Sequence, residues 1–234
     1  MKILSLLLVT AGLVWGQAAS VRIILVGDST MAVKSGWGPG FCGEIVTSQV
    51  TCLNMAKGGR SSASYREEGS WDQVMKVLNT PGDFTATYVL IQFGHNDQPG
   101  KPGRSTALAT QFPVNIRRYV DEVVGAGARP VLITPLTRRS FRDGKLHDNL
   151  GPWADATHKV AAEAKVPLLE LNADSAEAVQ KMGPQEADTF AVAPRPDPAF
   201  DYTHLGAKGS SFFARMVARE LVVAVPALQA FVRP

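Results

Sequence analysis

Short apolar runs alternate with helical patterns along most of the chain. Five runs predict β-strands, at Val21–Val26, Val50–Met55, Ala86–Gly94, Pro130–Thr134 and Leu168–Leu171. The patterns between and after them predict helices, at about Phe41–Ser48, Trp71–Leu78, Phe112–Val124 and Pro152–Ala164, and from about Ala207 onward. Strands that are apolar on both faces and separated by helices form a parallel sheet covered on both sides. The pattern therefore predicts an α/β protein, a three-layer α/β/α sandwich with a mainly five-stranded parallel sheet.

The first twenty residues have the organisation of a removable leader. Lys2 precedes a mostly apolar run, Ile3–Trp15, and the small residues Ala18-Ala19-Ser20 follow it. This order is typical of a signal peptide, and the run is short for a membrane span. We expect residues 1–20 to be removed, with an uncleaved anchor as the alternative. Residues 21–234 contain neither an internal repeat nor a linker, so we expect a single domain, exported to the periplasm or the medium.

Composition and charge exclude several classes of protein. The chain has 234 residues, 45% of them apolar and 19% charged, which is sufficient for a buried core. The formal net charge is +3, but Lys and Arg form no basic stripe, so we expect no nucleic-acid partner. After the leader no apolar run is long enough to span a bilayer, so we expect no stable membrane partner. A mildly basic surface tolerates an acidic polymer as substrate. Nothing in these patterns bears on the oligomeric state.

The chain has two cysteines, Cys42 and Cys52. An oxidising destination permits a disulfide between them, and two buried free thiols are the alternative. Two cysteines without suitable histidine neighbours do not make a metal site, so we expect no metal.

Polar residues and glycines follow the first three predicted strands. Gly27-Asp28-Ser29 ends the first, Lys57-Gly58-Gly59-Arg60 follows the second, and Gly94-His95-Asn96-Asp97 follows the third. In an open parallel sheet, ligands bind outside the carboxyl ends of the strands. We therefore expect the chemistry of this protein at that edge.

A serine at this edge becomes a nucleophile only with a base, an orienting acid and donors for an oxyanion. Among the four histidines, His204 has a carboxylate three residues earlier, Asp201, in a loop before the last helix. Such a carboxylate can bind the Nδ1 hydrogen and leave Nε2 to take a hydroxyl proton. The alternative is that Asp201 only caps the helix. We expect His147 and His158, in a polar loop and a helical pattern, to be solvated.

Four of these segments resemble the sequence blocks of the SGNH, or GDSL, hydrolases. They are Gly27-Asp28-Ser29-Thr30, Gly59 within "NMAKGGRSS", "GHND" at 94–97 and Asp201-x-x-His204, and they occur in family order over nearly the whole mature chain. The resemblance implies the flavodoxin-like fold of that family and a serine esterase. It implies the catalytic residues Ser29, Asp201 and His204, and oxyanion donors from Ser29, Gly59 and Asn96. It implies no cofactor.

Within that superfamily the chain is most similar to the rhamnogalacturonan acetylesterases. The similarity rests on "GDSTMA", "GRSSASYREEGSW", "IQFGHNDQ", "ITPLTRRSF" and "DYTHLGAKG". It implies hydrolysis of acetyl esters on a polysaccharide, the rhamnogalacturonan backbone of pectin, through an acetyl-enzyme. Aromatic rings can stack on sugars, and arginines can pair with uronate carboxylates. The candidate substrate contacts are Trp37, Arg60, Tyr65, His95, Arg138 and Arg139.

Three alternatives stay open. A lipase, lysophospholipase or thioesterase keeps the fold and the triad but needs an apolar groove, whereas the loops near Ser29 are mostly polar. A non-catalytic carbohydrate-binding protein has no use for a nucleophile and base. An O-acetyltransferase passes the acetyl group to an alcohol instead of water.

Overall fold

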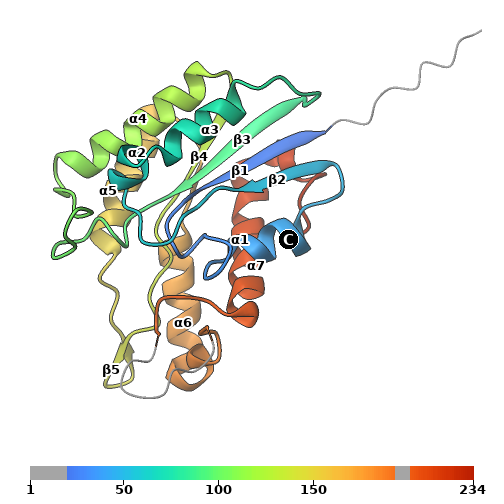
Figure 1. Ribbon diagram of the computed structural model, residues 1–234. Coiled ribbons are helices and arrows are strands. Elements are labelled where there is room, and N and C mark those ends of the chain that lie inside the picture. The colour runs from blue at the N-terminus through green and yellow to red at the C-terminus, as the bar shows by residue number, and fades with distance from the viewer. Residues whose placement is uncertain (1–19, 193–200) are drawn as a thin grey trace, which may run out of the picture.

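A five-stranded parallel sheet forms the centre of the molecule, in a computed structural model that describes residues 20–192 and 201–234 (Figure 1). The strands follow the order β2-β1-β3-β4-β7. Their bounds are Val21–Gly27 (β1), Val50–Asn54 (β2), Ala86–Gln92 (β3), Arg129–Ile133 (β4) and Leu168–Leu169 (β7). The predicted α/β fold with five parallel strands is confirmed. The expected leader lies outside the described residues apart from Ser20.

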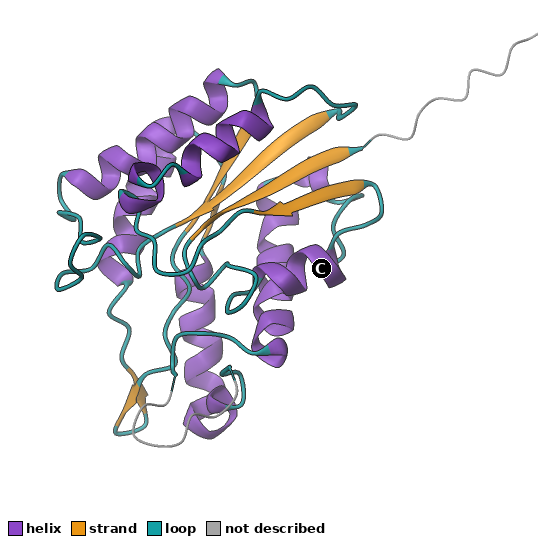
Figure 2. Cartoon of the chain, viewed as in Figure 1, coloured by secondary structure: helices purple, strands orange, loops and turns teal. Residues whose placement is uncertain are grey.

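Helices cover both faces of the sheet (Figures 1 and 2). Those on one face are α2 (Ser64–Glu67), α3 (Ser70–Leu78), α4 (Gln111–Gly125) and α5 (Gly151–Ala164). Those on the other are α1 (Gly38–Gly40), the π-helix η1 (Phe41–Ile45), α6 (Leu171–Asp188), α7 (Ala207–Ala224) and the 3₁₀ turn η2 (Pro226–Leu228). A short hairpin, β5 (Phe141–Arg142) and β6 (Lys145–Leu146), follows β4.

The alternation of side chains along each strand divides the core into two clusters. In β1, Ile23 and Leu25 join the cluster under α7, whereas Ile24 and Val26 join the cluster under α3 and α4. All four side chains are fully buried, because successive strand residues point to opposite faces and helices cover both. The polar strand ends are thereby left at one edge, where the loops gather in Figure 2.

Two helical predictions need correction. The 18-residue α6 was not predicted, because the apolar run at its start reads as the end of a strand through Leu171. Gly183, with a φ of 75°, and Pro184 then interrupt its pattern. The helix expected at Phe41–Ser48 is only the pair α1 and η1, and it ends where Val46 becomes extended.

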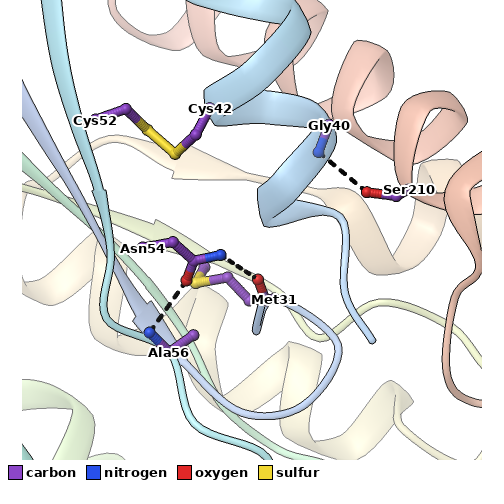
Figure 3. The surroundings of a disulfide bond; sticks show 7 residues. All are labelled: Met31, Gly40, Cys42, Cys52, Asn54, Ala56 and Ser210. Atoms are coloured by element: carbon purple, nitrogen blue, oxygen red, sulfur yellow. Dashed lines mark hydrogen bonds between the residues drawn. A yellow bond between two sulfur atoms is a disulfide. The ribbon is translucent and has the colours of Figure 1, made fainter. Parts of the chain in front are cut away.

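Cys42 and Cys52 form a disulfide that joins η1 to the edge strand β2 (Figure 3). The sequence left open a disulfide or two buried free thiols, and the structure has the disulfide. Close by, the Asn54 amide donates to the Met31 carbonyl at 2.9 Å and its oxygen accepts the N–H of Ala56 at 3.2 Å. The bonds of Asn54 tie the end of β2 to the loop that follows Ser29.

No helix among residues 20–192 and 201–234 is long and apolar enough to cross a membrane. Over the same residues, no group of three or more His, Cys, Asp or Glu side chains is arranged to hold a metal ion.

Candidate active site

Ser29 lies on the turn that ends β1. The Asp28 carboxylate accepts the backbone N–H of Thr30 at 2.9 Å and the Thr30 hydroxyl at 2.8 Å, which closes the turn locally. The Gln92 amide donates to the same hydroxyl at 2.6 Å and anchors the turn to the neighbouring strand β3. A side chain at Gly27 would lie 2.5 Å from the Gln92 carbonyl oxygen, so only glycine fits there. The close packing leaves Ser29 itself 7% exposed at the edge of a cleft.

His204 lies next to Ser29 although 175 residues separate them in the chain. Its Nε2 is 2.9 Å from Ser29 Oγ, and its Nδ1 is 2.8 Å from Asp201 Oδ2. The other oxygen of Asp201 accepts the backbone N–H of Thr203 at 3.1 Å and of His204 at 2.9 Å. Burial raises the pKa of Asp201, but these hydrogen bonds outweigh burial and lower it. Asp201 therefore stays ionised and orients the imidazole.

Arg139 holds the backbone of this histidine loop. Its Nη2 donates to the carbonyl oxygens of Asp201 at 2.8 Å and His204 at 2.9 Å, and its backbone N–H donates to Tyr202 O at 2.8 Å. The side chain is 2% exposed, and burial lowers its pKa to about 10, so it is still charged at neutral pH. Arg139 was predicted to touch substrate. That prediction is wrong, because the guanidinium is enclosed and its Nη2 donates to the loop that carries His204.

The predicted oxyanion donors line one hollow of about 520 Å³ together with Ser29 and His204. Asn96 donates one Nδ2 hydrogen to Arg60 O at 3.1 Å and makes no other donation among the described residues, so its second hydrogen is available. Gly59 has a φ of 79°, which favours glycine, in the turn after β2. The sequence gave no signal for Arg104, whose Nη1 makes long bonds of 3.4 Å to Asn96 Oδ1 and Gly59 O. Arg104 thus orients the amide of Asn96.

Asp97 joins the loop after β3 to the loop after β2. It accepts the backbone N–H of Ser62 at 3.1 Å, the Ser62 hydroxyl at 2.6 Å and the Thr106 hydroxyl at 2.9 Å. Burial raises the pKa of Asp97 to about 6 in spite of these bonds. Its position fixes Asn96, its neighbour in the chain, against the turn that carries Gly59.

His95 lies in a second hollow of about 300 Å³ that also includes Ser29, Arg138 and His204. Its Nδ1 is 3.3 Å from Asp28 Oδ2, without the alignment of a hydrogen bond, and its Nε2 has no partner in the described part of the chain. Burial lowers the pKa of His95, so the imidazole is neutral at neutral pH. His95 and Arg138 both line this hollow, as expected of residues that contact substrate. The Arg138 Nη1 donates to Asn149 Oδ1 at 2.5 Å.

The two predicted aromatic contacts are wrong. Trp37 is fully buried in the core, where its indole N–H donates to Gln92 at 2.9 Å. Tyr65 is also fully buried, and its hydroxyl donates to Met55 O at 2.7 Å. Neither ring has a face for a sugar. The Arg60 side chain is exposed but ion-paired with Glu68 at 2.8 Å, outside the two hollows that contain Ser29.

A hydroxyl, an imidazole and a carboxylate in hydrogen-bonded order, beside amide donors, can attack an acyl carbonyl and stabilise the oxyanion. Fold and site together define the class of α/β/α serine hydrolases. Residues 25–211 match the model of the GDSL-like Lipase/Acylhydrolase family. The chain belongs to this family and is a serine esterase.

Curated relatives and a solved structure agree with this membership. The chain is 35% identical to "Rhamnogalacturonan acetylesterase RhgT" of Bacillus subtilis over 85% of this chain and 88% of that protein. It is 31% identical to "Probable rhamnogalacturonan acetylesterase YesY" of the same organism, over 85% of this chain and 91% of that protein. The crystal structure of the Bacillus subtilis protein YxiM superposes with a TM-score of 0.70 at 24% identity and supports the fold. That match covers 88% of this chain and 57% of the YxiM chain.

Proposed function

We propose that this protein is a carbohydrate esterase that removes acetyl groups from the rhamnogalacturonan backbone of pectin, and that Ser29, His204 and Asp201 do the chemistry. The observation that carries the proposal is the unbroken series of contacts from Ser29 Oγ to His204 at 2.9 Å and from His204 to Asp201 at 2.8 Å. The substrate is taken from the names of the two Bacillus subtilis relatives.

In the proposed reaction, His204 Nε2 takes the proton of Ser29 as its oxygen attacks the acetyl carbonyl. The N–H groups of Ser29 and Gly59 and the Asn96 amide stabilise the tetrahedral oxyanion. His204 then protonates the departing sugar hydroxyl, while Asp201 stabilises the imidazolium. A water molecule repeats these steps on the acetyl-enzyme and releases acetate.

The character of the cleft favours acetate over a long acyl chain. Around the hollow that contains Ser29, the lining is made of polar residues and glycines apart from Val192. A fatty acyl chain needs an apolar groove, and the described residues around this hollow form none.

We further propose that residues 1–20 direct export, because a polymeric plant substrate is met outside the cell.

The test is acetate release from acetylated rhamnogalacturonan, with acetylated xylan in parallel and the Ser29→Ala protein as control. We expect release from the pectic polymer and none by the variant. Equal release from xylan would broaden the substrate to acetylated polysaccharides in general. A folded wild-type protein that releases acetate from neither polymer would refute the proposal. If that protein and the Ser29→Ala variant both bind the polymer, a carbohydrate-binding role takes its place.

A further inference from the structure

Besides Lys34, from the loop after β1, three cationic side chains line the hollows that contain Ser29 and His204. Lys101 and Arg104 come from the loop after β3, and Arg138 comes from the segment after β4. We call these three residues the cationic cluster. Within the described part of the chain, none of them forms an ion pair with a carboxylate. The cluster is therefore a local excess of positive charge at the active site.

The two arginines of the cluster donate hydrogen bonds only to uncharged acceptors among the described residues. Arg138 donates to the side-chain oxygen of Asn149, and Arg104 donates to Gly59 O and the Asn96 side-chain oxygen. The Lys101 ammonium has no hydrogen bond to any described residue. Lys101 is half-buried, and its ammonium group has no partner among the residues that the structure describes, so it is suited to bind an anion from solution.

Lys101 stands where three hollows meet. It lines the hollow of about 520 Å³ that contains Ser29 and the one of about 300 Å³ that contains His95. It also lines a larger hollow of about 790 Å³ that extends away from Ser29 along residues 100–106 and the start of α4. A polymer that occupies any of these three hollows therefore contacts Lys101.

The charges nearby agree with an anion at this junction. Burial, and then the positive charges of Arg138 and Arg104, lower the pKa of Lys101. Asp28 is buried behind His95, and Asp201 binds His204. Glu67 lines the large hollow but not the two that contain Ser29. Bound negative charge near Lys101 would relieve the repulsion within the cluster.

We infer that the cationic cluster, with Lys101 at its centre, is a subsite for the carboxylate of an anionic sugar unit close to the sugar that carries the acetyl group. This inference rests on the proposed function and deepens it, because it names the charged unit that the esterase selects. Lys101 is the specificity residue of the subsite. Arg104 also orients Asn96, so its replacement would affect the reaction as well as binding.

The experiment measures direct binding, so its readout does not depend on turnover. Isothermal titration calorimetry compares an unacetylated oligosaccharide of alternating galacturonate and rhamnose with a neutral xylo-oligosaccharide of equal length. We expect Lys101→Gln to weaken binding of the uronate oligomer by about tenfold, the effect of one charge-assisted hydrogen bond. We expect Lys101→Arg to keep most of the affinity. Lys159→Gln, which removes an exposed charge on α5, is the matched control and should change nothing.

The outcomes separate this inference from the proposed function. If wild type and Lys101→Gln bind the uronate oligomer equally well, or wild type prefers the neutral one, the subsite is refuted whatever the acetate-release assay shows. If Lys101→Gln weakens only uronate binding, the subsite is supported even when acetylated rhamnogalacturonan is not hydrolysed. In that case the substrate named above is wrong, and either a different acetylated anionic glycan or a carbohydrate-binding role takes its place.

Discussion

Ser29 and His204 meet in one cleft, but their two halves of the site are built differently. The Ser29 half sits on the carboxyl ends of β1 and β3, and short local bonds of Asp28, Thr30 and Gln92 close its turn. The His204 half is a loop that joins no strand of the central sheet, and the guanidinium of Arg139 binds its backbone carbonyls. The first half takes its geometry from the sheet. The second is held by the Arg139 side chain and by single backbone bonds, such as Leu205 N–H to Ser35 O at 2.8 Å and Gly206 N–H to Phe190 O at 2.9 Å.

The difference shows how such a fold places a nucleophile and a base together. Strand ends are fixed by the register of the parallel sheet, so a residue there needs little extra support. A loop needs its own support, because its backbone groups have no ladder to join. Perturbing the two halves in turn should therefore produce different kinds of loss.

The largest effect is expected at Ser29. Ser29→Ala removes the proposed nucleophile and should lower kcat by about 10⁴- to 10⁶-fold, because the remaining groups then act without a covalent step. Stability should change little, since the hydroxyl is at the cleft edge. Initial rates of acetate release and a urea unfolding curve measure both. A variant that keeps a tenth of the wild-type kcat would remove Ser29 from the chemistry.

The next effect is expected at Asn96, on the same half. Asn96→Ala removes one oxyanion donor, which typically costs about 10²- to 10³-fold in kcat. KM should stay within a few-fold, because the donor acts on charge that develops only in the transition state. Steady-state kinetics on one acetyl ester separate the two parameters. A loss confined to KM would mean that Asn96 binds ground-state substrate instead.

Arg139 tests the other half. Arg139→Met should lower kcat by about 10- to 100-fold through misplacement of His204, and lower the free energy of unfolding by about 1–3 kcal/mol, since carbonyls lose a buried donor. Arg139→Lys, which retains one donor group, should recover part of kcat. The matched control is Arg142→Met, an exposed arginine on β5. If Arg139→Met loses stability but keeps wild-type kcat, the backbone bonds of Leu205 and Gly206 are sufficient to position His204.

Much of this architecture was predictable from local pattern. The five strands follow from apolar runs, and each observed strand begins within one residue of its predicted start. The places of Ser29, Gly59 and Asn96 after strands pointed to the edge where a ligand binds, but the roles of these residues, and of Asp201 and His204, were implied by the resemblance to the SGNH blocks. These features can be predicted from the sequence because each depends on residues that are close together in the chain.

Contacts between distant segments left no such signal. Trp37 and Tyr65 were predicted as substrate contacts because aromatic rings can stack on sugars, yet their rings fill the core under α7 and α3. Arg139 was predicted to contact substrate because an arginine can pair with a uronate carboxylate. The fold instead buries it and brings it to a loop more than 60 residues later. Arg104 was not singled out, since its contact with Asn96 depends on the path of a loop.

The last prediction concerns stability alone and compares two carboxylates whose pKa values move in opposite directions, Asp97 beside the strand ends and Asp201 in the histidine loop. The pKa of Asp97 is raised to about 6, so the folded protein holds a proton that the unfolded chain has lost between about pH 4 and 6. Its contribution to the free energy of unfolding therefore falls as pH rises through that window, by up to about 3 kcal/mol. The contribution of Asp201, whose pKa is lowered, is lost instead as pH falls below about 4. Urea unfolding at several pH values should show that Asp97→Asn removes the fall between pH 4 and 6, whereas the exposed Asp155→Asn on α5 keeps it. If both variants keep the wild-type slope, Asp97 is ionised throughout, and the strand-end half of the site carries no electrostatic cost.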